Sequence, residues 1–163
     1  DTSLVKIKQQ LVKSNHNHEL DSALEDYLKG YKTPYTKDTS FLVGNDTLRI
    51  KIKHYCLLDS AISLPERYLT IYNLDSFITH NFESKIQLIK NEMLILNTIV
   101  KKESFAQFLN PELAKYGVLL YPGVRKEDDR IFIDYSISIP LTDVGIPVNI
   151  ELKGDGTIIY SAH

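Results

Sequence analysis

The sequence has little of several features that would mark a protein class. Its single cysteine, Cys56, cannot form an internal disulfide, which excludes a small secreted protein held together by disulfides. The four arginines are scattered along the chain, which weakens the case for phosphate recognition: Arg49, Arg67, Arg125 and Arg130. No apolar run approaches the roughly 20 residues that a membrane-spanning helix needs. The G-x-S-x-G, P-loop and dinucleotide-binding motifs are also missing.

Charge and composition are those of an ordinary folded domain. The chain has 163 residues, of which 43% are hydrophobic and 25% charged, so one domain with a sizeable core is expected. With 19 basic and 21 acidic residues the net charge is −2. This balance argues against nonspecific binding of nucleic acid or another polyanion, which depends on clustered positive charge.

The first 30 residues carry two apolar stripes at helical spacing, one over residues 4–11 and one over residues 20–28. The stripes differ in phase, which predicts two helices, or one helix broken around residues 14–17. Gly30 and the Thr33-Pro34 pair end the second helix.

The remainder of the chain is mostly of strand period. Residues 48–58 alternate between an apolar face, which includes His54 and Cys56, and a basic face with Arg49, Lys51 and Lys53. Further strands are expected over residues 67–72, 77–82, 131–139 and 146–152, the last turning at Gly154-Asp155-Gly156 into residues 157–160. Residues 84–100 fit either a helix or a hairpin folded at residues 90–92, and the dense isoleucines favour the hairpin. A short helix with Phe105, Phe108 and Leu109 comes next, and a last turn runs from Pro111 to Gly117.

These patterns predict one α+β domain over residues 1–163. A helical N-terminal segment, residues 1–30, precedes a mostly antiparallel β-sheet with one inserted helix over residues 41–163.

Three segments carry a resemblance to a known family. They are IVKKESFAQFL (residues 99–109), GVLLYPG (117–123) and IFIDYSISIPLTDVGIPVNIELKGDGTI (131–158). Together they resemble small lipoproteins of Bacteroides-type bacteria, a family of unknown function, over most of the chain from about Leu48 onward. The resemblance implies a location in the bacterial cell envelope, periplasmic or anchored to the outer membrane. It also implies a signal peptide and a lipidated cysteine before Asp1, and it supplies no catalytic residues.

Three short stretches could carry chemistry. In HNHELD, residues 16–21, the two histidines are two apart and diverge on a helix, so helix capping is favoured over a metal site. His54 and Cys56 could be a metal pair or a nucleophile pair, but their apolar strand face favours the core. The acidic run Glu127-Asp128-Asp129 lacks a calcium-loop pattern and is interpreted as a hairpin tip.

Tyrosines concentrate near the expected turns and strand ends, where they suit either recognition or ordinary packing: Tyr31, Tyr35, Tyr68, Tyr72, Tyr116 and Tyr121. The sequence assigns no catalytic, cofactor-binding or metal-binding residue. It favours a non-enzymatic envelope domain that binds or scaffolds a protein, glycan or small ligand, without nucleic acid, and that contacts the membrane only through a lipid anchor. The alternative is an enzyme, or a ligand-binding α+β cone or barrel, whose site is assembled from residues distant in sequence. A deep pocket that gathers His54, His80 and a carboxylate would favour this alternative.

Overall fold

The computed structural model describes residues 18–163 of the chain, with side chains described from Asp21 onward. Strand accounts for about 53% and helix for about 20%, so the fold is mixed but dominated by sheet. The helices are α2 (His18–Lys29), α3 (Pro111–Tyr116) and the 3₁₀ segments η1 (Glu66–Tyr68), η2 (Thr70–Tyr72) and η3 (Lys102–Phe108). The strands are β1 (Tyr35–Val43), β2 (Asp46–Cys56), β3 (Ile62–Leu64), β4 (Phe77–Thr79), β5 (Phe82–Lys90), β6 (Met93–Lys101), β7 (Val118–Glu127), β8 (Arg130–Ser138), β9 (Gly145–Leu152) and β10 (Ile158–Ala162).

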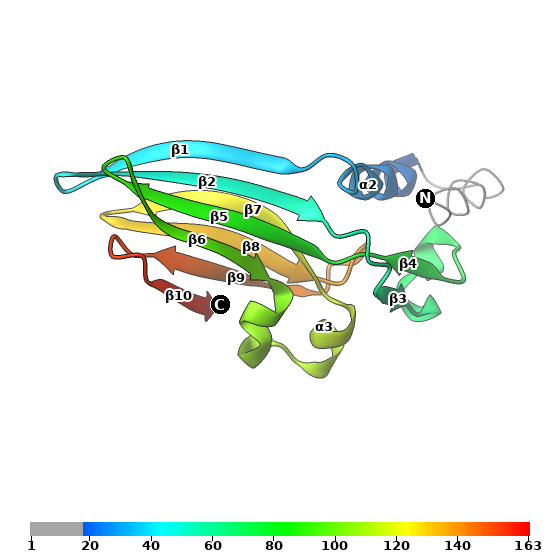
Figure 1. Ribbon diagram of the computed structural model, residues 1–163. Coiled ribbons are helices and arrows are strands. Elements are labelled where there is room, and N and C mark those ends of the chain that lie inside the picture. Colours follow the sequence, from blue (N-terminus) through cyan, green and yellow to red (C-terminus); the bar gives the residue numbers. More distant parts are fainter. Residues whose placement is uncertain (1–17) are drawn as a thin grey trace.

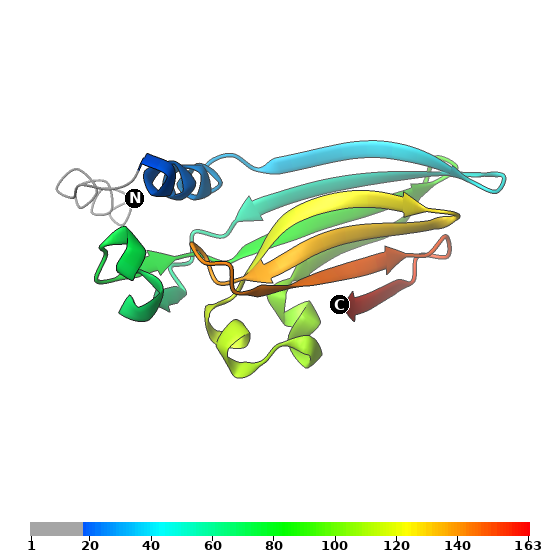
Figure 2. The same cartoon turned by 180° about the vertical axis from the view of Figure 1, so that it is seen from behind.

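Two four-stranded antiparallel sheets face each other as the layers of a sandwich (Figures 1 and 2). The first sheet has the order β1-β2-β5-β6, and the second has the order β10-β9-β8-β7. The chain leaves the first sheet after Cys56, forms the β3-β4 pair, and returns at Phe82, directly opposite Cys56. The Leu57 N–H closes this excursion by donating to the Asn81 carbonyl at 2.9 Å.

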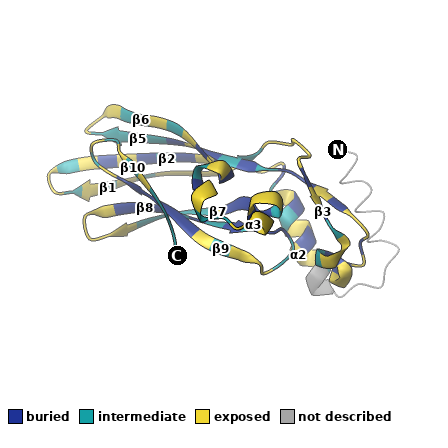
Figure 3. Cartoon of the chain, turned by 90° about the horizontal axis from the view of Figure 1, so that it is seen from below, coloured by how far each residue is buried: buried dark blue, intermediate teal, exposed yellow. Residues whose placement is uncertain are grey.

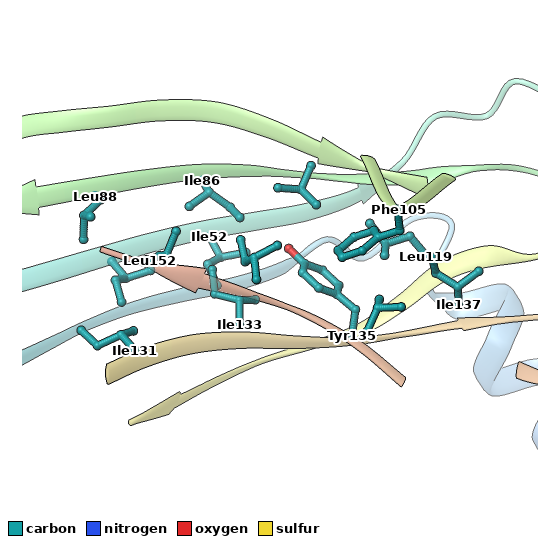
Figure 4. Close-up of a cluster of buried hydrophobic side chains, with 14 of the residues drawn as sticks. Ile52, Ile86, Leu88, Phe105, Leu119, Ile131, Ile133, Tyr135, Ile137 and Leu152 are labelled. Carbon is teal, nitrogen blue, oxygen red and sulfur yellow. The ribbon is translucent and has the colours of Figure 1, made fainter. Parts of the chain in front are cut away.

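The main core fills the space between the two sheets. Figure 4 shows Ile52, Ile86 and Leu88 of the first sheet directed toward Ile131 and Ile133 of the second. Each strand places alternate residues in this layer, because successive side chains of a strand point to opposite faces. Phe105 of η3 closes one side of the core and meets Tyr160 of β10 edge to face, with ring centroids 5.4 Å apart.

A second buried cluster closes one end of the sandwich. Leu24 and Leu28 of α2 pack there with Leu64, Leu69 and Phe77 from the excursion around β3 and β4. In Figure 3 the buried positions continue from the strands into α2 and β3. The apolar stripe expected over residues 20–28 is confirmed at Leu24 and Leu28, which are buried, and in part at Tyr27, whereas Ala23 is exposed. The helix ends before Gly30 as predicted.

Several other expectations are confirmed by the structure. Residues 84–100 form the β5-β6 hairpin, and its turn places Asn91 and Glu92 at φ 48° and 70°. Asn110 caps α3 by accepting the Leu113 N–H at 2.8 Å, and Gly117 follows the helix. The C-terminal strand β10 pairs antiparallel with β9 around the glycine turn, and residues 128–129 form the tip of the β7-β8 hairpin.

Other expectations are wrong, and each error has a physical reason. The expected single large sheet is two facing sheets and a third small one, because strand period does not reveal which strands pair. Residues 67–72 form 3₁₀ turns rather than a strand. Leu69 and Tyr72 are three residues apart, which is one 3₁₀ turn, so both are buried on the same side. Leu58 leaves the apolar face of β2, since the strand ends at Cys56 and Leu58 takes φ 52°. The expected helix over residues 4–11 and the break at residues 14–17 lie outside the described residues.

Candidate functional site

A pocket of about 610 Å³ lies between α2 and the mouth of the sandwich where β2, β5 and β7 begin or end. We call it the tyrosine pocket, and its lining comes from α2, the turn after it, β1, β2, β5 and β7: Ala23, Asp26, Tyr27, Gly30, Thr33, Tyr35, His54, Phe82, Leu120, Tyr121 and Pro122. These residues are almost 100 positions apart at the extremes, and the lining is mainly apolar and aromatic with a few polar groups. A concave apolar surface with sparse polar groups is the usual character of small-ligand sites.

On the α2 side of the pocket, the hydroxyl groups of two tyrosines contact the same threonine hydroxyl. The hydroxyl oxygens of Tyr27 and Tyr31 lie 2.7 Å and 2.6 Å from the buried Thr79 Oγ1. Burial raises the pKa of Tyr31 to about 12 and that of Tyr27 well above its ordinary value. Both rings therefore stay neutral, and they meet edge to face at 5.6 Å. This anchoring fixes the position of the Tyr27 ring in the pocket wall.

The opposite wall is an irregularity of β7. The register with β8 shifts between Leu120 and Gly123, so Tyr121 and Pro122 bulge out of the edge strand. Tyr121 takes φ 56° and is 72% exposed. A bulky residue with a positive φ is uncommon, because its Cβ meets its own backbone in that conformation. Bulges re-aim side chains, and this one places Tyr121 on the pocket.

His54 forms the inner end of the pocket. Its ring stacks on Phe82, with centroids 5.4 Å apart and planes 14° from parallel. Its Nδ1 lies 2.8 Å from the Oγ of Ser84, the residue directly opposite on β5. No hydrogen bond of ordinary geometry reaches Nε2 within the described part of the chain, although the nearby Leu119 backbone favours the protonated ring. Burial outweighs this effect and lowers the pKa of His54 to about 4.

His80 does not join His54 in the pocket. Its ring lies against Tyr31 with centroids 4.7 Å apart, and its Nδ1 accepts the Ser60 N–H at 2.8 Å. Among the described residues that line the pocket, Asp26 supplies a carboxylate. A pocket that gathers His54, His80 and a carboxylate would have favoured the alternative function. The tyrosine pocket contains His54 and a carboxylate but not His80.

His54 and Cys56, which the sequence offered as a possible pair, differ in how far they are buried. His54 is buried as the strand pattern predicts. Cys56 is half-buried at the last position of β2 and packs against the second buried cluster, the one that contains Leu24 and Phe77. Burial raises the pKa of the Cys56 thiol, which disfavours the reactive thiolate. The core interpretation is confirmed for His54 and holds only in part for Cys56.

The described residues of the other stretches that the sequence marked do not line the pocket. In the acidic run, Glu127 ends β7 and pairs with Arg125, while Asp128 and Asp129 form the turn. In HNHELD, residues 16 and 17 lie outside the described residues and Asp21 lies in α2, so the capping interpretation stays a prediction. Among the residues that the structure describes, no group of three or more histidine, cysteine, aspartate or glutamate side chains is placed to hold a metal ion.

The tyrosines marked by the sequence divide between packing and exposed surfaces. Tyr35 and Tyr121 line the tyrosine pocket, and Tyr121 also borders a second pocket of about 660 Å³ with Tyr68 and Tyr72. Tyr31 is buried. Sequence reasoning missed the role of Tyr27, which lines both pockets, because its place in a helical apolar stripe is also that of a core residue.

Comparison with known proteins adds no assignment. Neither a scan of the chain against protein-family models nor a search of curated proteins finds a match. Within residues 18–163, no helix combines the length and hydropathy needed to cross a membrane.

Proposed function

We propose that this protein is a non-enzymatic envelope domain that binds a small amphipathic ligand in the tyrosine pocket. The observation that carries the proposal is Tyr121, which is held at a positive φ by a bulge and presents an exposed ring to the pocket. Strained backbone costs on the order of 1–2 kcal/mol, and it tends to persist at functional sites. The envelope location is supported by the resemblance to Bacteroides-type lipoproteins.

The chemistry of the lining indicates the kind of ligand. The rings of Tyr27, Tyr35 and Tyr121 offer apolar faces, and Asp26 and Thr33 supply polar atoms. A volume of about 610 Å³ suits a compound of a few rings, including a short saccharide whose C–H faces stack on tyrosine. The ligand is expected to place an apolar face on the tyrosines and a polar group toward Asp26.

Binding is favoured over catalysis by the state of the polar groups. His54 has a pKa of about 4, so it is a weak base at neutral pH. Its hydroxyl partner, Ser84, is fully buried and does not line the pocket, so this serine offers no nucleophile to a bound ligand. The alternative, an enzyme with a site assembled from distant residues, would need a reacting group other than this pair.

Ligand screening by protein NMR tests the proposal. A library of saccharides and small aromatic compounds is expected to contain binders that shift the amide signals of Tyr27, Tyr35 and Tyr121. Tyr121→Ala and Tyr35→Ala should weaken these binders at least tenfold, whereas the matched change Tyr68→Ala, in the second pocket only, should leave affinity unchanged.

Two results would contradict the proposal. One is a set of binders whose shifts lie outside the pocket or survive Tyr121→Ala. The other is conversion of a bound compound to product at a rate abolished by Asp26→Asn, which would establish the enzyme alternative.

A further inference from the structure

The two outward faces of the sandwich differ in how their charges are balanced. On the second sheet, Arg125 pairs with Asp134 at 2.9 Å, and Arg130 pairs with Glu151 at 3.0 Å. Lys153 shares Glu151 at 3.3 Å. The arginines lie over the ring of Phe132 and cover it. These cations of the second sheet are neutralised by carboxylates of the same face.

The first sheet carries cations that are not neutralised. Its inward residues Leu48, Ile50 and Ile52 are buried, so Lys51 and Lys53 project outward on β2. Lys85 projects outward on β5, directly opposite Lys53. We call these three lysines the basic face. Within the described residues none of them forms an ion pair.

The carboxylates of the basic face have other partners. Asp38 receives two hydrogen bonds from the Arg49 guanidinium, at 2.8 Å and 2.7 Å. This bonding, with a smaller contribution from the Lys51 charge, lowers the pKa of Asp38. Glu83 accepts the hydroxyl of Tyr55. Like charges directly opposite on neighbouring strands destabilise a sheet, so the Lys53–Lys85 pair acts against folding. An anion lying over the pair would remove this repulsion.

Exposed aliphatic side chains border the lysines on the same face. On β6, Ile99 lies directly opposite Lys85 and is 49% exposed, and Leu94 lies opposite the outward Ile89 and is 53% exposed. On β1, Leu42 lies opposite Thr47 and is 67% exposed. In Figure 1 the four strands that carry these residues run side by side as one layer. The outward face therefore combines a basic centre with aliphatic margins.

We propose that this face of the first sheet binds the surface of a bilayer that contains anionic phospholipids. Lipid phosphates would neutralise Lys51, Lys53 and Lys85, while Leu94, Ile99 and Leu42 would enter the boundary between headgroups and acyl chains. A soluble anionic polymer would satisfy the lysines but would leave the aliphatic side chains in water. The sequence predicts membrane contact only through a lipid anchor, so this contact is additional to it. It does not depend on a ligand in the tyrosine pocket.

Vesicle flotation tests the proposal. The protein should float with vesicles of phosphatidylglycerol and phosphatidylcholine, and not with phosphatidylcholine alone. Binding should fall as salt rises from about 50 to about 500 mM, because the Debye length shortens to a few ångströms. The triple variant Lys51→Gln/Lys53→Gln/Lys85→Gln should bind on the order of 100-fold more weakly, at roughly fivefold for each lysine.

Matched variants separate this surface from net charge alone. Lys32→Gln/Lys115→Gln/Lys126→Gln removes the same charge from exposed positions away from the basic face and should bind within about twofold of the original. Leu94→Ser/Ile99→Ser should weaken binding to anionic vesicles at least fivefold while retaining the salt dependence. Circular dichroism spectra that match the original protein establish that each variant is folded.

Three outcomes would overturn the proposal. In the first, the two triple variants bind vesicles equally. In the second, Leu94→Ser/Ile99→Ser binds vesicles as well as the original protein, which would show that charge alone explains the binding. In the third, the protein binds heparin–agarose through the basic face but does not float with anionic vesicles, which would indicate a soluble polyanion as partner.

Discussion

His54 Nδ1 lies 2.8 Å from Ser84 Oγ across two neighbouring strands of the first sheet, and both side chains are buried. This contact and the stacked ring of Phe82 hold the imidazole inside the sandwich. Because burial disfavours the charged ring, the pKa of His54 is about 4 in the folded protein, against about 6.5 for an exposed histidine.

This difference makes stability depend on pH. Above about pH 6.5 the ring is neutral in both states and contributes no slope; as pH falls from about 6.5 to about 4, the unfolded chain takes up the proton first and stability decreases. The loss is on the order of 3 kcal/mol below pH 4. Urea unfolding at a series of pH values should show this loss, and His54→Asn should remove most of it. Burial also lowers the pKa of His80, so this residue adds a smaller loss of its own as pH falls, which His80→Asn should remove. Identical pH profiles for His54→Asn and the original protein would contradict the expectation.

Lys102 is expected to stabilise the fold by donating hydrogen bonds to backbone carbonyls at the C-terminal end of α3. Its buried ammonium donates to the Ala114 carbonyl at 2.8 Å and to the Gly117 carbonyl at 3.0 Å. Lys102→Met keeps the aliphatic stem but leaves these acceptors without a donor, so it should lower the free energy of unfolding by about 2–3 kcal/mol. The neighbouring exposed residue provides the control, since Lys101→Met should change stability by less than about 0.5 kcal/mol. Chemical denaturation of both variants measures the difference, and equal stabilities would show that the two contacts contribute nothing.

Cys56 is expected to react slowly while the protein is folded. It is half-buried, and burial raises the pKa of its thiol, so both access and thiolate content are reduced. Reaction with a thiol reagent at pH 7.5 should be at least about tenfold slower in buffer than in concentrated urea. Equal rates in the two conditions would show that the end of β2 opens freely, and would restore Cys56 as a candidate reactive group.

The C-terminal hairpin is expected to be essential for a soluble fold. Deletion of residues 154–163 removes β10 and uncovers the paired edge of β9, and it takes Tyr160 away from Phe105. An open apolar edge strand promotes association, so the shortened protein should aggregate. Tyr160→Ala alone should cost about 2–3 kcal/mol of unfolding free energy, whereas Ile159→Ala, on the outward side, should cost less than about 0.5 kcal/mol. Size-exclusion chromatography and thermal denaturation check both statements; a monomeric deletion protein with an unchanged melting temperature would refute them.

The HNHELD stretch is expected to bind no zinc or copper stoichiometrically, since side chains two apart on a helix diverge. Elemental analysis of the purified protein should give well under one equivalent per chain. One equivalent that disappears in His16→Ala or His18→Ala would contradict this expectation.

Strand faces and turns could be predicted from the sequence because they depend on neighbours in the chain. Alternation places Ile50 and Ile52, or Ile131 and Ile133, on one face of a strand wherever the strand lies in space. The hairpin at Asn91 depends likewise on a residue type that tolerates positive φ. The β1 strand could not be predicted in the same way. It is an edge strand whose first residues are exposed on both faces, so it lacks the alternation typical of a half-buried strand.

The candidate site could be predicted only in fragments. Tyr35 and Tyr121 stood out as tyrosines near turns, but nothing in the sequence placed them beside His54 or Tyr27. Their meeting depends on the docking of α2 on the end of the sandwich and on the bulge at Tyr121, which are long-range events.

The sequence by itself determined the antiparallel character of this domain, the inward faces of its long strands, and the near-zero net charge, because each follows from residue type and local spacing. Only the tertiary structure decided that the strands divide into two facing sheets, since pairing depends on contacts between segments far apart in the chain. It also decided where the charges gather. The net charge says nothing about where charges lie: ion pairs neutralise Arg125, Arg130 and Lys153 on the second sheet, whereas strand pairing places Lys53 opposite Lys85 on the first.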